Sequence, residues 1–102
     1  MFEFVVETYA PPQATGILAA RVEELARAAE QASEPGAEVR LLGAVFLPGE
    51  ETCFYLYRAA SADAVRAAAA HGRLRLERIS QAVAITPSHT GALPVRNILT
   101  HT

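Results

Sequence analysis

Cysteine and long apolar runs are scarce in this 102-residue chain, and each scarcity excludes a class of structure. The single cysteine, Cys53, has no partner for an internal disulfide and lacks the Cys/His spacing of a structural zinc site. No apolar run approaches the roughly 20 residues of a membrane-spanning helix, and the opening residues, MFEF, lack the basic and apolar segments of a secretion signal. We therefore expect a cytoplasmic protein with no membrane partner and no structural zinc.

A surplus of basic charge is missing as well. Lysine and arginine together number 9, and aspartate and glutamate number 11, so the net charge is −2. Without a positive field, binding of nucleic acid or of anionic lipid is not expected. The sequence contains no P-loop, dinucleotide fingerprint, G-x-S-x-G or H-E-x-x-H motif, which removes the main support for the common nucleotide-binding, hydrolase and metalloprotease functions.

Four stretches have the composition of β-strands. Residues 2–9, 38–47, 52–58 and 78–86 are rich in β-branched and aromatic side chains. Pro11 and Pro12 end the first stretch, because proline cannot donate a hydrogen bond to a strand ladder. The turn-forming residues 48–51 (PGEE) join the second and third stretches and predict an antiparallel hairpin.

Two helices are predicted between these strands. Over residues 15–33, apolar residues recur at spacings of four and three and form one helical stripe, and Pro35 and Gly36 end the segment. The second helix begins at Ser61, whose hydroxyl can cap the first turn, and ends at Gly72, which we expect in the left-handed conformation. The stripe residues of the first helix are Leu18, Val22, Leu25, Ala29 and Ala32.

The order strand, helix, strand, strand, helix, strand is the signature of the ferredoxin-like α+β fold, with two helices on one face of a four-stranded antiparallel sheet. A chain of this length forms a single core. We place the ferredoxin-like domain at residues 1–86. Residues 87–102 are polar with one apolar patch, and we expect an irregular tail or an arm over a neighbouring molecule.

The sheet face without helices decides whether the protein pairs with another copy. Alternation places Phe2, Phe4 and Val6 on the helix side, and we expect Phe54 and Leu56 beside them. The opposite face is then too apolar for bare solvent, whichever side of the second strand it includes. Two-fold dimers are the commonest way to cover such a face, so we predict a homodimer. The face is predicted to carry Glu3, Val5, Glu7, Tyr9, Cys53, Tyr55 and Tyr57.

The same face offers a candidate cleft for a small molecule. Polar groups that converge in an apolar setting are the usual lining of such a site. Arg78, paired with the glutamate before it, can close the pocket. The alternative is that tyrosines at every second position are ordinary strand residues, and that the glutamates reach the sheet edge. The candidate cleft residues are Glu7, Tyr9, Tyr55, Tyr57 and Arg78.

The histidines and the cysteine are separate candidates. His71, at the end of the second helix, can ligate a metal together with Glu7, or it can be a solvent-facing residue, because no His or Cys lies three or four positions away. His89 and His101 belong to the tail and join a metal site only if the tail folds back. Cys53 lies in mid-strand, where we expect a small buried hydrophobe rather than a nucleophile.

Residues 50–66 (EETCFYLYRAASADAVR) resemble a family of small uncharacterised bacterial proteins, some of which are described as nickel-binding. Residues 2–9 and 39–47 are similar to the first two strands of that family, and residues 76–79 (LERI) are similar to the run before its last strand. The resemblance covers residues 2–86. It implies a ferredoxin-like fold, a dimeric α/β-barrel assembly and a small binding protein for nickel or another divalent metal.

One departure from the family bears on the metal. Members often carry a histidine in the second helix, and alignment on Leu74 leaves Ala69 at that position. His71 follows two residues later, about 200° around the helix. A wider group of dimeric α/β-barrel proteins includes small monooxygenases and isomerases.

Three hypotheses follow from these residues and this resemblance. The first is a cytoplasmic dimeric binding protein for a divalent metal such as nickel, with Glu7, His71 and a histidine of the tail as candidate ligands. The second is a cofactor-independent enzyme for a small apolar substrate, with Glu7 and either Tyr55 or Tyr57 as acid and base. The third is a purely structural or regulatory dimer.

Overall fold

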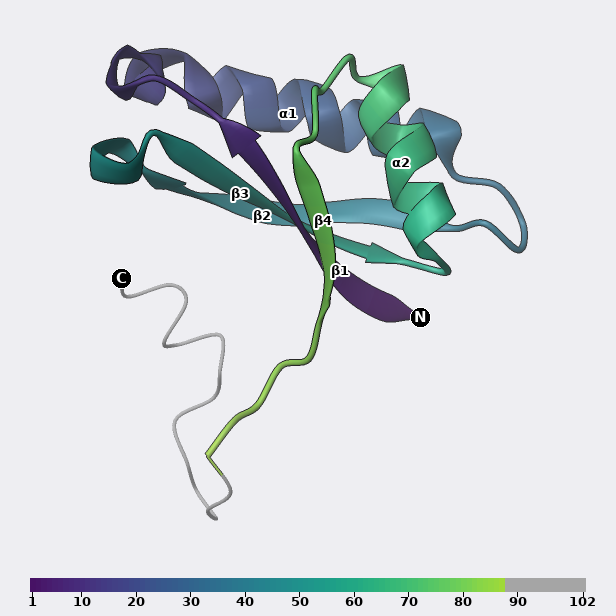
Figure 1. The fold of residues 1–102 in the computed structure, drawn as a ribbon. Helices are drawn as coiled ribbons and strands as arrows, with labels where there is room; N and C mark the ends of the chain where they lie inside the picture. Colours follow the sequence, from purple (N-terminus) through teal and green to yellow (C-terminus); the bar gives the residue numbers. More distant parts are fainter. Residues whose placement is uncertain (88–102) are drawn as a thin grey trace.

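A computed structural model describes residues 1–87 as a four-stranded sheet with two helices on one side (Figure 1). Neighbouring strands are antiparallel and follow the order β2-β3-β1-β4. The predicted ferredoxin-like α+β fold is confirmed. Apart from Pro87, the predicted tail lies outside the described residues. The elements are β1 (Phe2–Tyr9), η1 (Pro12–Ala14), α1 (Thr15–Ala32), β2 (Val39–Leu47), η2 (Pro48–Glu50), β3 (Thr52–Ala59), α2 (Ala62–His71) and β4 (Arg78–Ala82).

Both helices lie where the sequence predicts them. The apolar stripe of α1 faces the sheet, with Leu25 and Ala29 fully buried. α2 begins at the predicted cap, where the Ser61 hydroxyl accepts a hydrogen bond of 3.1 Å from the Ala64 N–H. Within the part of the chain that the structure describes, neither helix has the length and apolar character to cross a membrane.

The C-terminal end of α2 differs from the prediction. The left-handed residue is Arg73, with a φ of 56°, whereas Gly72 has a φ of −88°. The Arg73 N–H donates to the Ala70 carbonyl at 3.0 Å, and the Leu74 N–H donates to the Ala69 carbonyl at 2.8 Å. These two hydrogen bonds are typical of helix ends at which the residue after the C-cap is left-handed. Glycine is the usual residue at that position, and here it is Arg73.

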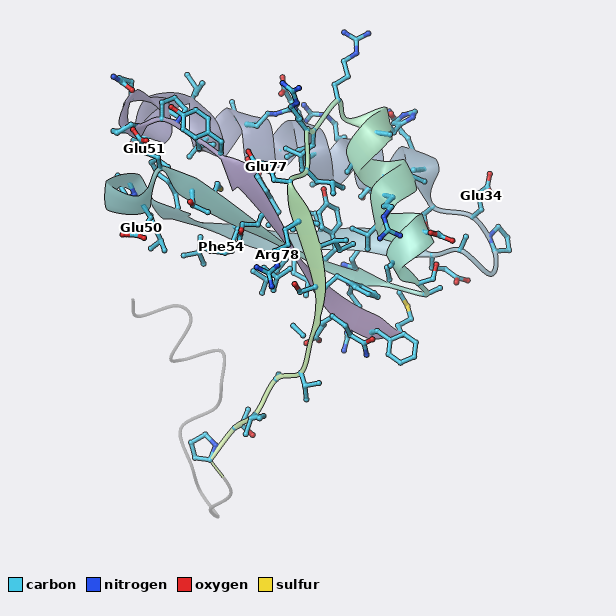
Figure 2. All side chains as sticks on the ribbon, viewed as in Figure 1. Glu34, Glu50, Glu51, Phe54, Glu77 and Arg78 are labelled. Atoms are coloured by element: carbon cyan, nitrogen blue, oxygen red, sulfur yellow. The ribbon has the colours of Figure 1, made fainter. Side chains whose placement is uncertain are left out.

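The face of β3 is the opposite of the predicted one. Phe4 and Val6 of β1 are buried on the helix side as expected, and they pair with Tyr57 and Tyr55. Directly paired residues point to the same side of a sheet, so both tyrosines lie beneath the helices. Phe54 lies on the open side instead (Figure 2). The helix side of β3 is Cys53, Tyr55, Tyr57 and Ala59, and its open side is Thr52, Phe54, Leu56 and Arg58.

β2 changes face in its middle. Its pairing with β3 shifts between Leu41 and Gly43, so Leu42 is the extra residue of a β-bulge. Leu41 pairs with Tyr57 on the helix side, and Ala44, three residues later, is on the helix side too. Neither alternating set of β2 therefore faces the helices along its whole length.

β4 ends at Ala82 instead of at the predicted residue 86. Ala82 pairs with Glu3, and β1 begins only one residue earlier, at Phe2, so later residues have no strand to pair with. Val83 and Ile85 are accordingly exposed.

Candidate functional site

The sheet separates the residues that were predicted to share one cleft. Glu7 pairs with Arg78, and both lie on the open side. Tyr55 and Tyr57 are buried on the helix side. Tyr9 ends β1 and is 59% exposed. The prediction of one shared face is therefore wrong for the two tyrosines of β3.

An acidic hollow of about 150 Å³ lies where the end of β1 meets the β2–β3 turn. Figure 2 labels three of its acidic residues, Glu50, Glu51 and Glu77. The Glu77 carboxylate accepts a hydrogen bond of 3.0 Å from the Tyr9 N–H and so fastens the segment before β4 to β1. Among the described residues, Glu77 makes no ion pair with Arg78, and no three metal-ligand side chains come together. We assign no cation to this hollow. Its lining is Glu7, Thr8, Tyr9, Glu50, Glu51, Thr52 and Glu77.

The two predicted metal ligands lie on opposite sides of the sheet. Glu7 is on the open face. His71 is the last residue of α2, and its Nε2 atom lies 2.9 Å from the Oε1 atom of Gln31 on α1. His89 and His101 lie outside the described residues. Nickel binding stays a prediction, without a ligand cluster in residues 1–87 to favour it.

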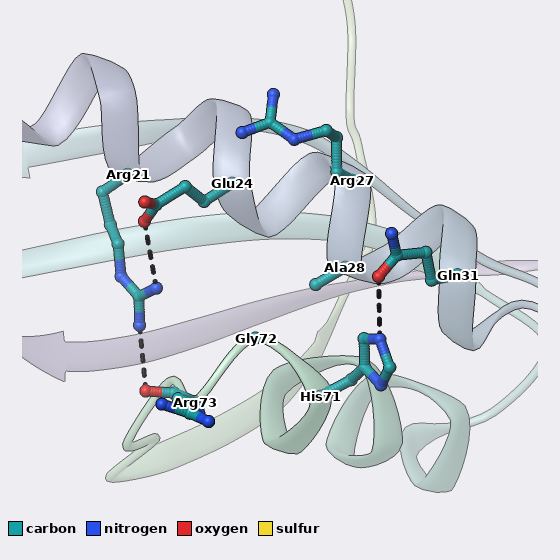
Figure 3. A pocket seen from close by; sticks show the side chains of 8 residues that line it. All are labelled: Arg21, Glu24, Arg27, Ala28, Gln31, His71, Gly72 and Arg73. Atoms are coloured by element: carbon teal, nitrogen blue, oxygen red, sulfur yellow. Dashed lines mark hydrogen bonds and ion pairs between the residues drawn. The ribbon is translucent and has the colours of Figure 1, made fainter.

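A polar hollow of about 430 Å³ lies between α1 and the C-terminal end of α2 (Figure 3). Arg21 crosses it: its Nη1 atom lies 3.4 Å from a Glu24 carboxylate oxygen, and its Nη2 atom donates to the Arg73 carbonyl at 2.9 Å. Contact between His71 and Gln31 joins the two helices further along. The lining is Arg21, Glu24, Arg27, Ala28, Gln31, His71, Gly72 and Arg73.

A third hollow, the apolar cleft, shares Arg21 and Arg73 with the polar hollow. Its volume is about 320 Å³. The end of β1, the first turns of α1 and the segment after α2 form its walls, and Tyr55 of β3 reaches it from the sheet. The lining is Thr8, Tyr9, Ala10, Pro11, Ala14, Ile17, Leu18, Arg21, Tyr55, Arg73, Leu74 and Arg75.

Burial controls the ionisation of the tyrosines on the helix side. Burial raises the pKa of Tyr57 to about 12. Burial also raises the pKa of Tyr55, and the neighbouring Cys53 thiol adds to that increase. The positive charge of Arg21 opposes both pKa shifts but is the smaller effect. Both hydroxyls therefore keep their protons at neutral pH. The Tyr57 hydroxyl is buried without a hydrogen-bond partner among the described residues.

Cys53 is buried as predicted, with 1% of its surface exposed. Burial raises the pKa of its thiol, so the thiolate that a nucleophilic cysteine needs is disfavoured at neutral pH. The prediction of a small buried hydrophobe is confirmed.

Sequence reasoning missed the arginines of the two hollows. Arg21 follows Leu18 by three residues and precedes Leu25 by four, so it lies next to the apolar stripe of α1, and this spacing is a signal that identifies it. Arg73 and Arg75 lie in a segment without a periodic pattern. Their positions depend on the left-handed residue after α2, which the sequence predicts at Gly72 and the structure has at Arg73.

Comparisons of the chain with family models, with curated protein sequences and with solved structures find no match. The resemblance to the nickel-binding family stays a prediction. The case for a function therefore rests on the geometry of the apolar cleft and the polar hollow.

Proposed function

We propose that this protein binds a small, mainly apolar organic molecule in the apolar cleft. The observation that carries the proposal is the cleft itself: apolar side chains such as Leu18 and Leu74 line about 320 Å³ of space, with a few polar groups set among them. This volume lies at the lower end of the range of small-molecule sites, roughly 300–1,000 Å³. The site would suit a ligand of one or two rings.

The position of the cleft in the fold supports the same proposal. One wall comes from residues 73–75, an irregular segment between α2 and β4, and the opposite walls come from α1 and from the sheet. Binding residues commonly lie on irregular segments that a rigid scaffold holds in place. The Arg21 hydrogen bond to the Arg73 carbonyl, at 2.9 Å, links this segment to α1.

Binding is favoured over the acid–base chemistry of the enzyme hypothesis. A general base must lose its proton near neutral pH, and burial raises the pKa of Tyr57 to about 12 and also that of Tyr55. Glu7, the other proposed acid–base group, lies on the opposite side of the sheet. Tyr55 is better suited to donate a hydrogen bond to a ligand than to accept a proton from it.

A fluorescence titration with the neutral probe N-phenyl-1-naphthylamine tests the proposal. We expect saturable binding that Ile17→Glu weakens about tenfold, because Ile17 lines the cleft and is 67% exposed, so its replacement removes apolar contact without disturbing the core. Ala20→Glu, at an exposed position of α1 outside the cleft lining, is the matched control and should bind like the wild type. Equal loss in both variants, or no saturable binding, would contradict the proposal.

We also propose that two copies pair through the open face of the sheet. Apolar side chains lie on this face, among them Val45 and Leu47 of the edge strand β2, which are 52% and 41% exposed. Charges of both signs lie on the same face, so opposite charges can meet across a two-fold axis. The charged residues are Glu3 and Glu7 on β1, Arg40 on β2, Arg58 on β3 and Arg78 on β4, and the Glu3–Arg58 pair is 3.7 Å apart.

The pairing is tested by measuring the mass in solution with light scattering. We expect twice the chain mass of 10.9 kDa for the wild type and a single chain for Val45→Glu, which places a charge at an exposed apolar position of the face. Ala67→Glu on the exposed side of α2 introduces the same charge away from that face and should remain dimeric. A monomeric wild type, or a dimeric Val45→Glu, would refute the pairing.

A further inference from the structure

We infer that the ligand of the apolar cleft is an organic anion: an apolar body with one carboxylate or sulfonate group, which Arg21 and Arg73 meet at the boundary between the apolar cleft and the polar hollow. This inference rests on the proposed function and adds the chemical class of the ligand.

Positive charge predominates around the boundary between the two hollows. Within residues 1–87, the linings of the two hollows together contain four arginines and one carboxylate, in a chain whose net charge is −2. The apolar cleft alone contains three arginines and no acidic residue. A site with this lining attracts anions and repels cations. The four arginines are Arg21, Arg27, Arg73 and Arg75, and the carboxylate is Glu24.

These arginines have hydrogen-bond donors that are left for a ligand. The two hydrogen bonds of the Arg21 side chain, to Glu24 and to the Arg73 carbonyl, engage two of the five N–H donors of a guanidinium. Neither Arg73 nor Arg75 pairs with a carboxylate of the described residues. Guanidinium groups bind planar acid groups through two parallel hydrogen bonds, which is why a carboxylate or sulfonate fits them.

The backbone of Arg73 has a left-handed conformation. Its φ of 56° is a conformation that favours glycine, and the hydrogen bonds around it are those in which glycine is the usual residue. An arginine there is less favourable for the fold than glycine would be. A binding role for the side chain accounts for the presence of arginine at this position.

Tyr55, which lines the apolar cleft, adds a neutral polar group to the site. The hydroxyl of Tyr55 stays protonated at neutral pH because burial disfavours the tyrosinate. It therefore offers a donor and no negative charge to a bound acid group. Arg21 and Tyr55 both line the apolar cleft, so the cation and the neutral donor are available to the same ligand.

The experiment compares two probes that share a ring system. Both 1-anilinonaphthalene-8-sulfonate and N-phenyl-1-naphthylamine have the same apolar body, and only the first has an acid group. We expect the wild-type protein to bind the sulfonate about tenfold more tightly than the neutral probe. Arg73→Asn, which tolerates the left-handed backbone, should weaken sulfonate binding about tenfold and change neutral-probe binding less than about twofold.

Two controls locate the effect. Arg66→Gln removes an arginine of α2 that pairs with Asp63 outside both hollows, and it should bind both probes like the wild type. Val45→Glu changes the open face of the sheet and should bind both probes unchanged. Circular dichroism of each variant verifies that it is folded.

The outcomes separate this inference from the proposed function. Neutral-probe binding in the cleft without a preference for the sulfonate would overturn the inference and leave the proposed function standing. Equal losses in Arg73→Asn and Arg66→Gln would also overturn the inference. Absence of binding for both probes would overturn both.

Discussion

A Gly72→Ala variant is expected to unfold with a free energy about 2 kcal/mol below that of the wild-type protein, because the site has no room for a methyl group. A Cβ atom at this position would lie 2.7 Å from the Leu25 Cδ2 atom and 3.1 Å from the Ala28 Cβ atom. Leu25 is fully buried, so it has little freedom to move aside. The backbone itself allows alanine, since φ is −88°. Urea unfolding followed by circular dichroism measures the loss.

Gly16→Ala is the matched control. Gly16 lies in the first turn of α1, and a Cβ there would have no neighbour within 4 Å. Alanine is the better helix former, so this variant should gain up to about 1 kcal/mol. A Gly72→Ala variant that is as stable as the wild type would show that α1 and the end of α2 are packed less closely than the structure indicates. The spacing of the polar hollow, which Gly72 lines, would then need revision.

Alkaline pH is expected to destabilise the fold through its buried tyrosines. In the unfolded chain a tyrosine ionises near its ordinary pKa of about 10, whereas burial raises the pKa of Tyr57 to about 12. Between these values the unfolded chain releases a proton that the folded chain keeps, so rising pH favours unfolding. The stabilisation is complete below about pH 10 and is lost above it, by at most about 3 kcal/mol for Tyr57.

Two further groups act in the same direction, because burial also raises the pKa of Tyr55 and of Cys53. Unfolding free energies measured in urea over a series of alkaline pH values give the total loss. Tyr57→Phe should reduce this loss. The variant should also be more stable by about 1 kcal/mol at neutral pH, because the hydroxyl that it removes is buried without a hydrogen-bond partner among the described residues.

Tyr9→Phe is the control for this substitution. Tyr9 is 59% exposed, and its replacement should leave both the neutral stability and the alkaline loss unchanged. If Tyr57→Phe loses as much stability as the wild type on going to alkaline pH, the burial of Tyr57 is not the cause.

The secondary structure was predictable because each element is marked locally. The strand at residues 2–9 ends before a proline pair, and α1 combines an apolar stripe with a Pro-Gly end. Ser61 caps α2 as its sequence position indicates. Strand order then follows from the sequence of elements, because short connections leave few other topologies.

The orientation of individual strands was less predictable, since it depends on pairing between distant segments. β3 has apolar residues on both sides, so alternation gives no preference for either one. Its face is set by the register that brings Tyr55 opposite Val6 of β1. In β2 the bulge at Leu42 moves later residues to the other side. The neighbouring Gly43 is a sequence signal for a bulge, but it does not say which residues lie on which side.

The candidate site was predicted only in part, for the same reason. The tyrosines drew attention to β3, and Tyr9 and Tyr55 do line one cleft. The arginines that complete the site come from α1 and from the segment after α2, more than 50 positions apart in the chain for Arg21 and Arg73. Such a site becomes visible only when α1 and the end of α2 are packed together.

We propose that the helix side of the sheet, and not the open side, holds the ligand. Nuclear magnetic resonance of isotope-labelled protein titrated with N-phenyl-1-naphthylamine tests it most directly. We expect the backbone amide signals of Ala10, Leu18 and Leu74 to shift on binding, because these residues line the apolar cleft. Shifts confined to the open-face residues Val45 and Leu56 would contradict it.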